Sequence, residues 1–384
     1  MFSSKILFVL DADILNIHHG VRRYFLSLAD NVSKFFSVEF MLHSRTGEKH
    51  TYNEIVFSDC FVKNNGFTDD LLVGSSRREI ISKITSNKHI GTSKRMSTSA
   101  SYSTSSIGDR VPDNYSLVIV AGPWIHIEKH QFSCPVACVG LDAIPNIYAL
   151  YNIDDLGLQE FAWRHQYGFN YYDIIFSISE ESKSQISHFT RETNKITVIP
   201  PFIPVGFSSV PDLKIQSKKN TIILAAPFDE RKGLSLMPEF INNSKADSII
   251  IFGGVRCTTN SLLNFFNDLK VNDIEWWSSV TTNKQIELYQ RSRALLFPSF
   301  NEGLGLPVLE AHACNIPAVV SDIKPLNILV REEFIIKNGT TSGSSTLNHA
   351  LSLPPSTTDF GLKDMDLTFI AFMETLISNS QETT

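Results

Sequence analysis

The chain has 384 residues, of which 42% are hydrophobic and 19% charged, so it can bury sizeable cores and is not globally disordered. At about 150 residues per domain, this length predicts two or three domains. The formal net charge of −6 argues against nucleic acid as the main partner, because proteins that bind the phosphate backbone usually carry a basic excess.

Cysteine usage and hydropathy favour a cytoplasmic protein. The five cysteines are odd in number and lack CxxC spacing, which fits a reducing compartment. The early apolar run Ile6–Leu10 is too short for a signal peptide. No run reaches the ~18 apolar residues that a membrane-spanning helix needs, so we expect any membrane association to be peripheral.

Short apolar runs alternate with amphipathic stretches along the chain, which is typical of βαβ units and a parallel sheet. In the amino-terminal half, the predicted strands are 5–10, 37–42, 115–122, 135–142 and 172–179. In the carboxyl-terminal half, the predicted strands are 220–226, 247–254, 273–277, 294–299, 317–322 and 333–337. The pattern therefore occurs twice.

This repetition predicts an α/β protein with two Rossmann-like, doubly wound domains. We expect an amino-terminal domain of residues 1–200 and a carboxyl-terminal domain of residues 218–363, with a linker of residues 201–217 whose prolines prevent a helix. The carboxyl ends of both sheets are expected to face a central cleft, where open α/β sheets bind ligands. Residues 364–384 are expected to form a helix that packs back on the amino-terminal domain.

Two histidine-containing stretches in the first half have competing interpretations. Gly20 stands at the entry to a predicted helix, where glycine lets a ligand approach the backbone. The adjacent His18 and His19 are either acid/base groups or solvated turn residues. The pattern HIEKH at 126–130 could hold a metal, but no further cluster of ligands accompanies it, so we predict no metal site.

Residues 75–110 depart from the alternating pattern, because they are rich in serine and threonine and carry seven Lys or Arg against two acids. One interpretation is a solvated loop of the amino-terminal domain. The other is a basic flap that contacts an anionic lipid surface or a lipid-linked diphosphate.

A basic pair follows the first predicted strand of the second half. Arg231 and Lys232 stand where a helix begins, so their charges oppose the helix dipole and are poorly placed for helix stability alone. The position favours binding of a diphosphate. A plain exposed basic pair is the alternative.

The stretch FPSFNEGLGLPVLEAHACNIPAVVSD, residues 297–322, places Glu302 and Glu310 around a glycine turn. Proline is favoured at the first position of a helix, so a helix is expected from Pro307, and its start is an anion site. Because the two acids would repel a phosphate, we expect them to bind sugar hydroxyls, with the basic pair beside the phosphates.

A dinucleotide site is the rival interpretation of the same stretch. The turn Gly303-Leu304-Gly305 follows a strand and precedes a helix, as in the dinucleotide fingerprint. However, Val308 occupies the position of the third glycine, and the stretch lies late in its domain. The sequence therefore argues against an NAD enzyme.

The stretch PSFNEGLGLPVLEAHACNIPAVVSD resembles the signature of family 4 retaining glycosyltransferases of the GT-B fold. The similarity covers most of the chain. It includes the segments DERKG, HHGVRRY, LDAIP and DIIFSISEESKSQI.

The resemblance implies a donor site whose residues are Gly20, Arg231, Lys232, Glu302, Gly303, Leu304, Gly305, Leu306 and Glu310. In it, Glu310 hydrogen-bonds the donor ribose, and Glu302 with the amides of the glycine turn holds the transferred sugar. Arg231 and Lys232 hold the diphosphate, and Gly20 lets the amino-terminal loop close over it.

The resemblance also implies the catalytic residues Arg231, Lys232, Glu302 and Asp142. Leu141 replaces the histidine common in the family, so a contact with the sugar or a catalytic role falls to Asp142. The leaving phosphate deprotonates the acceptor in this family, so neither a metal nor another cofactor is implied.

We therefore predict a cytoplasmic glycosyltransferase, peripheral on the inner face of the cytoplasmic membrane, that moves a hexose from a GDP- or UDP-linked sugar with retention. The resemblance implies a saccharide or lipid-linked oligosaccharide acceptor in O-antigen or capsule assembly, and mannose is the leading candidate sugar. The alternatives are a nucleotide-sugar epimerase, a sugar-phosphate synthase of the same fold, or a non-catalytic sugar-nucleotide-binding protein.

Overall fold

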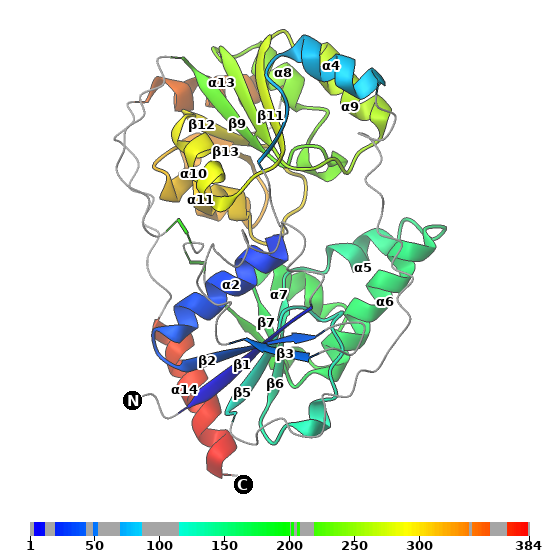
Figure 1. The fold of residues 1–384 in the computed structure, drawn as a ribbon, viewed down its shortest axis with the longest axis vertical. Coiled ribbons are helices and arrows are strands. Elements are labelled where there is room, and N and C mark those ends of the chain that lie inside the picture. Colours follow the sequence, from blue (N-terminus) through cyan, green and yellow to red (C-terminus); the bar gives the residue numbers. More distant parts are fainter. Residues whose placement is uncertain are drawn as a thin grey trace. The chain divides into compact units, whose positions relative to one another are not determined.

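Two seven-stranded sheets organise the chain in the computed structural model (Figure 1). The structure describes residues 4–11, 20–43, 49–52, 70–86, 115–199, 201–202, 206–207, 219–337, 340–353 and 367–382. The first unit comprises residues 1–67, 98–205 and 363–384, and the second comprises residues 68–97 and 206–362.

The sheet of the first unit has the strand order β3-β2-β1-β5-β6-β7-β8. These strands are β1 (Lys5–Asp11), β2 (Ser37–His43), β3 (Lys49–Tyr52), β5 (Leu117–Val120), β6 (Val136–Gly140), β7 (Ile174–Ser177) and β8 (Ile196–Val198). All neighbouring pairs are parallel except β2 and β3. Consecutive residues of β1 and β5 are buried, as expected for parallel strands covered on both faces.

Helices cover this first sheet. They are α2 (Gly20–Ser33), α5 (Ile144–Ala149), α6 (Leu156–Tyr171), α7 (Glu180–Ser187) and α14 (Leu367–Glu382). The apolar face of α2 packs against β1, where the rings of Phe25 and Phe8 meet edge to face at 5.1 Å. The carboxyl-terminal α14 belongs to the same unit, and its Phe369 ring lies 5.5 Å from the ring of Phe176 on β7.

The sheet of the second unit has the order β14-β13-β12-β9-β10-β11-β4. Its strands are β4 (Leu71–Gly74), β9 (Thr221–Ala225), β10 (Ser248–Phe252), β11 (Asp273–Ser279), β12 (Ala294–Phe297), β13 (Ala318–Ser321) and β14 (Ile335–Ile336). Only β4 is antiparallel to its neighbour. Since β9 lies between β10 and β12, the strand order reverses at the centre of the sheet, which is where such sheets bind ligands.

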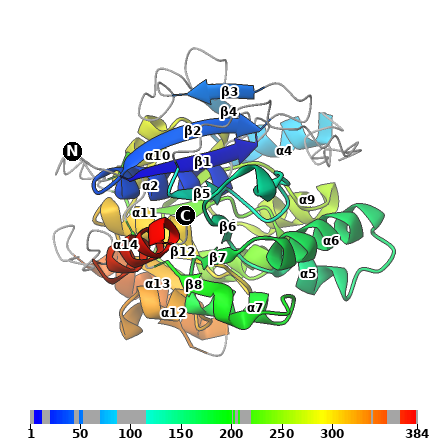
Figure 2. The same ribbon diagram turned by 90° about the horizontal axis from the view of Figure 1, so that it is seen from below.

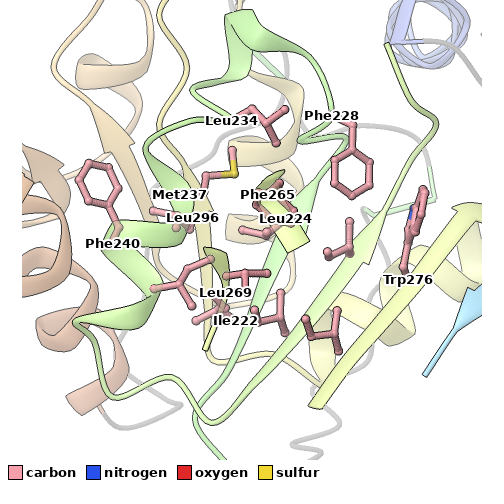
Figure 3. Close-up of a cluster of buried hydrophobic side chains, with 14 of the residues drawn as sticks. Ile222, Leu224, Phe228, Leu234, Met237, Phe240, Phe265, Leu269, Trp276 and Leu296 are labelled. Carbon is pink, nitrogen blue, oxygen red and sulfur yellow. The ribbon is translucent and has the colours of Figure 1, made fainter. Parts of the chain in front are cut away.

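The helices of the second unit are α4 (Arg77–Ser86), α8 (Met237–Asn242), α9 (Thr259–Asp268), α10 (Thr282–Gln290), α11 (Leu306–Ala313), α12 (Leu326–Leu329) and α13 (Thr340–Ser352). Figure 3 shows the buried cluster that joins some of them to the sheet. In this cluster the ring of Phe228 lies 4.8 Å from that of Trp276 on β11, in edge-to-face contact. Threonines accept backbone hydrogen bonds at the starts of α9 and α10.

Residues 71–86 correct two predictions. We expected residues 75–110 to be a loop of an amino-terminal domain of residues 1–200, but β4 and α4 belong to the second unit. The reason is packing, because β4 pairs with β11, and Ile80 and Ile84 are fully buried in the core of that unit. Residues 87–110 lie outside the described residues.

Among the helices that the structure describes, none is both long and apolar enough to cross a membrane.

Candidate active site

The loops after β9 and β12 bring together the residues that the sequence singled out in the second half. Arg231 and Lys232 lie in a short 3-10 helix of one turn, Glu230–Lys232, which follows β9. Glu302 and Glu310 follow β12, the neighbour of β9 in the sheet. All four side chains therefore lie near the carboxyl ends of the two strands where the strand order reverses.

The carboxylate of Glu302 forms ion pairs with both cations of this turn. The Lys232 ammonium donates to Glu302 Oε1, and Arg231 Nη1 lies 3.1 Å from the same oxygen. Arg231 also donates to the backbone carbonyl of Asn301, and the Lys232 ammonium lies 4.4 Å over the ring of Phe297. We call Arg231, Lys232 and Glu302 the cation–glutamate cluster.

Burial and charge act together on the cation–glutamate cluster, whose side chains are only 9–15% exposed. Burial on its own raises the pKa of Glu302, but the two cations outweigh it and hold that pKa below the ordinary carboxyl value. Burial also lowers the pKa of Lys232, and the nearby carboxylate opposes that shift. With two cations around one carboxylate, the cluster is suited to a further anion.

The local fold fixes the positions of the two cations. The side chain of Asp229 accepts a hydrogen bond from the backbone amide of Arg231 at 3.0 Å and so caps the 3-10 turn. Gly233 ends the turn with a φ of +75°, and a Cβ there would come within 2.2 Å of the carbonyl oxygen of Pro298. Only glycine therefore allows the loop after β9 to pass so close to the loop after β12. The regular helix expected at Arg231 begins instead at Met237.

The predicted glycine turn leads directly into α11. Gly305 is the residue before the helix and has a φ of +93°, where a Cβ would come within 2.5 Å of Leu326. The helix starts at Leu306, one residue before the predicted Pro307. Gly303 and Leu304 are buried beside Glu302, so the turn and the helix start lie next to the cation–glutamate cluster.

Glu310 on α11 is fully buried, and two neutral side chains donate hydrogen bonds to its carboxylate. Its Oε2 accepts hydrogen bonds from Gln285 Nε2 at 2.7 Å and from Tyr289 Oη at 3.1 Å. Both donors come from α10 and stand four residues apart, on one face of that helix. We did not predict Gln285 and Tyr289. Their spacing on a helix just before β12 is the signal that could have indicated them.

The predicted residues of the first half lie in the first unit. Asp142 follows β6, and its Oδ1 accepts a hydrogen bond from the backbone amide of Ile144 at 2.9 Å, which fixes the turn before α5. Gly20 is the exposed first residue of α2, near the carboxyl end of β1. His18 and His19 lie outside the described residues. Both Asp142 and Gly20 therefore stand at the carboxyl edge of the first sheet.

The HIEKH stretch runs into a 3-10 turn that spans Lys129–Gln131. The ring of His126 packs at 4.6 Å against that of Tyr171, and burial lowers the pKa of its imidazole. His130 lies 3.2 Å from the carboxylate of Glu128. Nowhere in the part of the chain that the structure describes do three His, Cys, Asp or Glu side chains cluster as metal ligands would.

A family model matches most of the second unit. Residues 208–352 match the family model described as Glycosyl transferases group 1, and this range includes the cation–glutamate cluster and Glu310. Residues 208–352 are therefore similar to group 1 glycosyl transferases, and the resemblance that the signature stretch indicates is confirmed.

Two curated relatives are named as bacterial mannosyltransferases. The chain is 39% identical over 89 residues to the O-antigen chain mannosyltransferase RfbU of Salmonella typhimurium, which is 22% of this chain and 25% of that protein. It is 39% identical over 180 residues to the serotype-specific mannosyltransferase WbdA of Escherichia coli, which is 41% of this chain and 22% of that protein. The chain thus spans about a quarter of the length of these relatives.

The likeness to solved structures extends over both units. WaaG, described as a glycosyltransferase involved in lipopolysaccharide biosynthesis, matches with a TM-score of 0.57 over 98% of this chain and 95% of that chain, at 12% identity. At this identity the match shows the fold alone. The fold is GT-B, with two Rossmann-like domains, as the sequence predicted.

Proposed function

We propose that this protein is a retaining glycosyltransferase that moves a hexose from a nucleoside-diphosphate sugar to a saccharide acceptor. The observation that carries the proposal is the cation–glutamate cluster at the strand-order reversal of the sheet, within the residues that are similar to group 1 glycosyl transferases. Buried cations beside a helix start provide what a departing diphosphate requires, which is fixed positive charge in a site of low dielectric.

In this proposal the two cations bind the donor diphosphate and stabilise the charge that develops on it as the glycosidic bond breaks. Glu302 keeps both cations in place before the donor arrives. Once the diphosphate shares the cations, the carboxylate of Glu302 accepts hydrogen bonds from hydroxyls of the transferred sugar. Amides of the turn from Gly303 to Leu306 complete the contacts to that sugar.

Glu310 holds the opposite end of the donor. Gln285 and Tyr289 fix the position of its carboxylate, and we assign to that carboxylate the hydrogen bonds from the two ribose hydroxyls. We therefore assign the ribose to the α11 side of the site and the phosphates to the cation–glutamate cluster.

The first unit supplies the acceptor side in this proposal. We assign a donor-binding role to Gly20 and a contact with the reacting sugars to Asp142. The leaving phosphate oxygen takes the proton of the acceptor hydroxyl on the same face of the donor sugar, so its configuration is retained. This route uses neither a metal nor another cofactor.

The names of the relatives suggest the substrates. RfbU and WbdA are described as mannosyltransferases, the former of the O-antigen chain. We propose mannose as the transferred sugar, GDP or UDP as its carrier, and a saccharide acceptor, linked to lipid, in surface-polysaccharide assembly. The protein would then work in the cytoplasm, peripherally on the inner face of the cytoplasmic membrane.

Acceptor-dependent release of a nucleoside diphosphate tests the activity. Purified protein is incubated with GDP-mannose or with UDP-linked hexoses, with and without a mannose-containing oligosaccharide, and the products are separated. We expect a lengthened oligosaccharide with an α-linked new sugar from an α-linked donor. An altered donor sugar with no transfer would indicate an epimerase, transfer to a sugar phosphate alone would indicate a synthase, and binding without turnover would indicate a non-catalytic protein.

A further inference from the structure

The second unit contains a segment from early in the chain. Residues 68–97 belong to this unit, although they precede most of the first unit in the sequence. The described part of the segment, residues 70–86, contains β4 and α4. Figures 1 and 2 both show α4, in light blue, beside α9. The family match covers residues 208–352 and therefore assigns no role to this segment.

Packing and hydrogen bonds fix the segment in the second unit. Ile80 and Ile84 are buried in the core of that unit. The backbone amide of Arg77 donates to the carbonyl of Asn272 at 3.2 Å, and β4 pairs with β11 at the edge of the sheet. Apolar burial together with strand pairing makes the segment an integral part of this unit.

The direction of β4 places Asp70 at the carboxyl edge of this sheet. The strand β11 runs parallel to the central strands, so its last residues, Ser278 and Ser279, lie at the edge where β9 and β12 end. Because β4 is antiparallel to β11, its first residue, Leu71, lies opposite Ser279. Ser278 Oγ donates to the carbonyl of Leu71 at 3.3 Å. Asp70, directly before Leu71, therefore lies at the same edge of the sheet as the candidate active site.

Asp70 stands at the amino-terminal end of α10. Its Oδ1 accepts a hydrogen bond at 2.8 Å from the backbone amide of Thr281, the residue directly before the helix. The first turn of α10 contains no acidic residue, whereas Lys284 within it carries a positive charge. A carboxylate is favourable at this end of a helix, because the free amides there carry partial positive charge. Asp70 thus supplies from a remote segment the acid that the first turn of α10 lacks.

Three hydrogen bonds in series join Asp70 to Glu310. The first is the contact between Asp70 and the amide of Thr281. In the second, the carbonyl of Thr281 accepts from the backbone amide of Gln285 at 2.9 Å. In the third, Gln285 Nε2 donates to Glu310 Oε2 at 2.7 Å. Because Gln285 lies only one turn into α10, a shift of the helix start moves the side chain that orients the Glu310 carboxylate.

We infer that Asp70 is a positioning residue for the donor site. It fixes the start of α10 and thereby aligns the Glu310 carboxylate with the ribose hydroxyls. In this role it contacts Thr281 rather than the donor, and it lies 211 positions before that residue, outside the residues that match the family model. The inference rests on the proposed function where that function assigns the ribose to Glu310. It deepens the assignment by naming a residue that determines how tightly the ribose is held.

Discrimination between ribose and 2′-deoxyribose tests the inference. Isothermal titration gives the Kd of GDP and 2′-deoxy-GDP, and of UDP and 2′-deoxy-UDP, for the wild type and for Asp70→Ala. The discrimination factor is the Kd of the deoxy form divided by that of the ribose form. We expect a factor of at least about ten for the wild type, because a hydrogen bond to a carboxylate is lost, and of about three for Asp70→Ala. Since both affinities come from one sample, an unfolded fraction cancels from the factor.

Two further variants distinguish positioning from general stability. Asp70→Asn keeps an oxygen that can accept from the amide of Thr281, so its factor should stay within about twofold of the wild type. Glu79→Gln is the matched control, because Glu79 is a 42%-exposed carboxylate of the same segment that pairs with Lys83 and accepts from the amide of Ser75 at 3.0 Å. This control changes the contacts of α4 and leaves α10 untouched, so its factor should equal that of the wild type.

A double-variant cycle and hydrogen exchange locate the effect. In a Glu310→Gln background, Asp70→Ala should change the factor no further, because the two residues act through one contact with the ribose. The backbone amides of α10 should exchange faster in Asp70→Ala than in the wild type or in Glu79→Gln, because the start of the helix is less firmly fixed.

Three results would overturn the inference. An unchanged factor in Asp70→Ala would show that α10 holds Glu310 without Asp70. A factor that falls equally in Glu79→Gln would assign the effect to the segment as a whole. A further loss on adding Asp70→Ala to Glu310→Gln would mean that Asp70 acts by another route.

The wild type itself separates this inference from the proposed function. If it transfers sugar and discriminates against the deoxy forms, the variants alone decide the inference. If it transfers sugar but binds both forms equally, the ribose assignment is wrong, and the inference falls with it. If it binds neither GDP nor UDP and transfers no sugar, the proposed function fails, while the exchange of the α10 amides still decides whether Asp70 fixes the start of that helix.

Discussion

Glu302 and Glu310 are both buried and belong to one loop–helix segment, yet their charges are satisfied in opposite ways. The carboxylate of Glu302 contacts two cations, whereas that of Glu310 accepts hydrogen bonds from the neutral Gln285 and Tyr289. A buried carboxylate paired with cations forms a tightly coupled charge cluster, whereas one held by neutral donors stays a strong acceptor. Under the proposed function, this difference assigns the phosphates to the surroundings of Glu302 and the ribose hydroxyls to Glu310.

Removing a cation from Glu302 should have the largest effect. In Lys232→Met the leaving diphosphate loses a fixed charge, and we expect the kcat of transfer to fall about 10²–10³-fold. Steady-state kinetics at saturating donor measure this. Lys219→Met is the control, because the Lys219 side chain is 64% exposed and pairs with Asp273 before the start of β9, at the opposite end of that strand from the loop.

The same substitution leaves Glu302 buried without one of its cations, which costs about 3–5 kcal/mol of stability. The double variant Lys232→Met/Glu302→Gln should recover much of that loss in thermal unfolding without recovering activity. A Lys232→Met enzyme with less than about a tenfold loss of kcat would show that the diphosphate binds elsewhere.

Changing Glu310 should have a smaller effect of a different kind. Glu310→Gln keeps the shape of the side chain but replaces a charged acceptor with a neutral one, so we expect the donor KM to rise about tenfold while kcat changes less. Initial rates against donor concentration separate the two constants. Glu287→Gln, a 43%-exposed carboxylate on α10, is the control. A fall in kcat with an unchanged KM would contradict the ribose assignment.

The central strands and the glutamate turn could be predicted from sequence because their signals are local. A run of apolar residues at 220–226 became β9, Thr221–Ala225, and the proline after the glycine turn marked the start of α11 within one residue. Such signals depend on the period of a strand or on the φ preference of one residue. Neighbours distant in sequence do not change them.

The parts of the structure that could not be predicted from the sequence depend on tertiary contacts. Residues 75–86 belong to the stretch 75–110 that looks like a polar loop by composition. Their placement follows from the pairing of the preceding strand β4 with the edge strand β11 and from a core that Ile80 and Ile84 fill. In the same way, Gln285 and Tyr289 acquire their role only because α10 packs beside α11. Composition cannot show which distant surface a short amphipathic segment will meet.

Lowering the pH should distinguish Glu302 from an exposed carboxylate. Its pKa lies below the ordinary value of 4.5, so below pH 4.5 the unfolded state takes up a proton that the folded state does not. The stability contribution of Glu302 is therefore complete above that value and is lost as the pH falls through the folded pKa. Thermal unfolding from pH 7 to pH 3 should show the difference between wild type and Glu302→Gln shrinking as acid is added.

Glu332→Gln is the control for this experiment, because Glu332 pairs with Lys337 on the surface and is 80% exposed. Solvent screens that pair, so its substitution should change the unfolding temperature little at any pH. A constant difference between wild type and Glu302→Gln across the acid range would mean that Glu302 stabilises the fold through shape rather than charge.

The smallest expected effect concerns Asp229, at the outer side of the cation–glutamate cluster. Its Oδ2 lies 3.9 Å from Arg231 Nη2, while its Oδ1 caps the turn by accepting from the backbone amide of Arg231. Asp229→Asn keeps an oxygen for the cap and removes the charge, so a nucleoside diphosphate should bind up to about fivefold more tightly at low ionic strength. Isothermal titration at two salt concentrations measures this, with Asp247→Asn as the control. If the substitution weakens binding instead, Asp229 contacts the ligand directly, and the phosphate part of the site extends beyond the two cations.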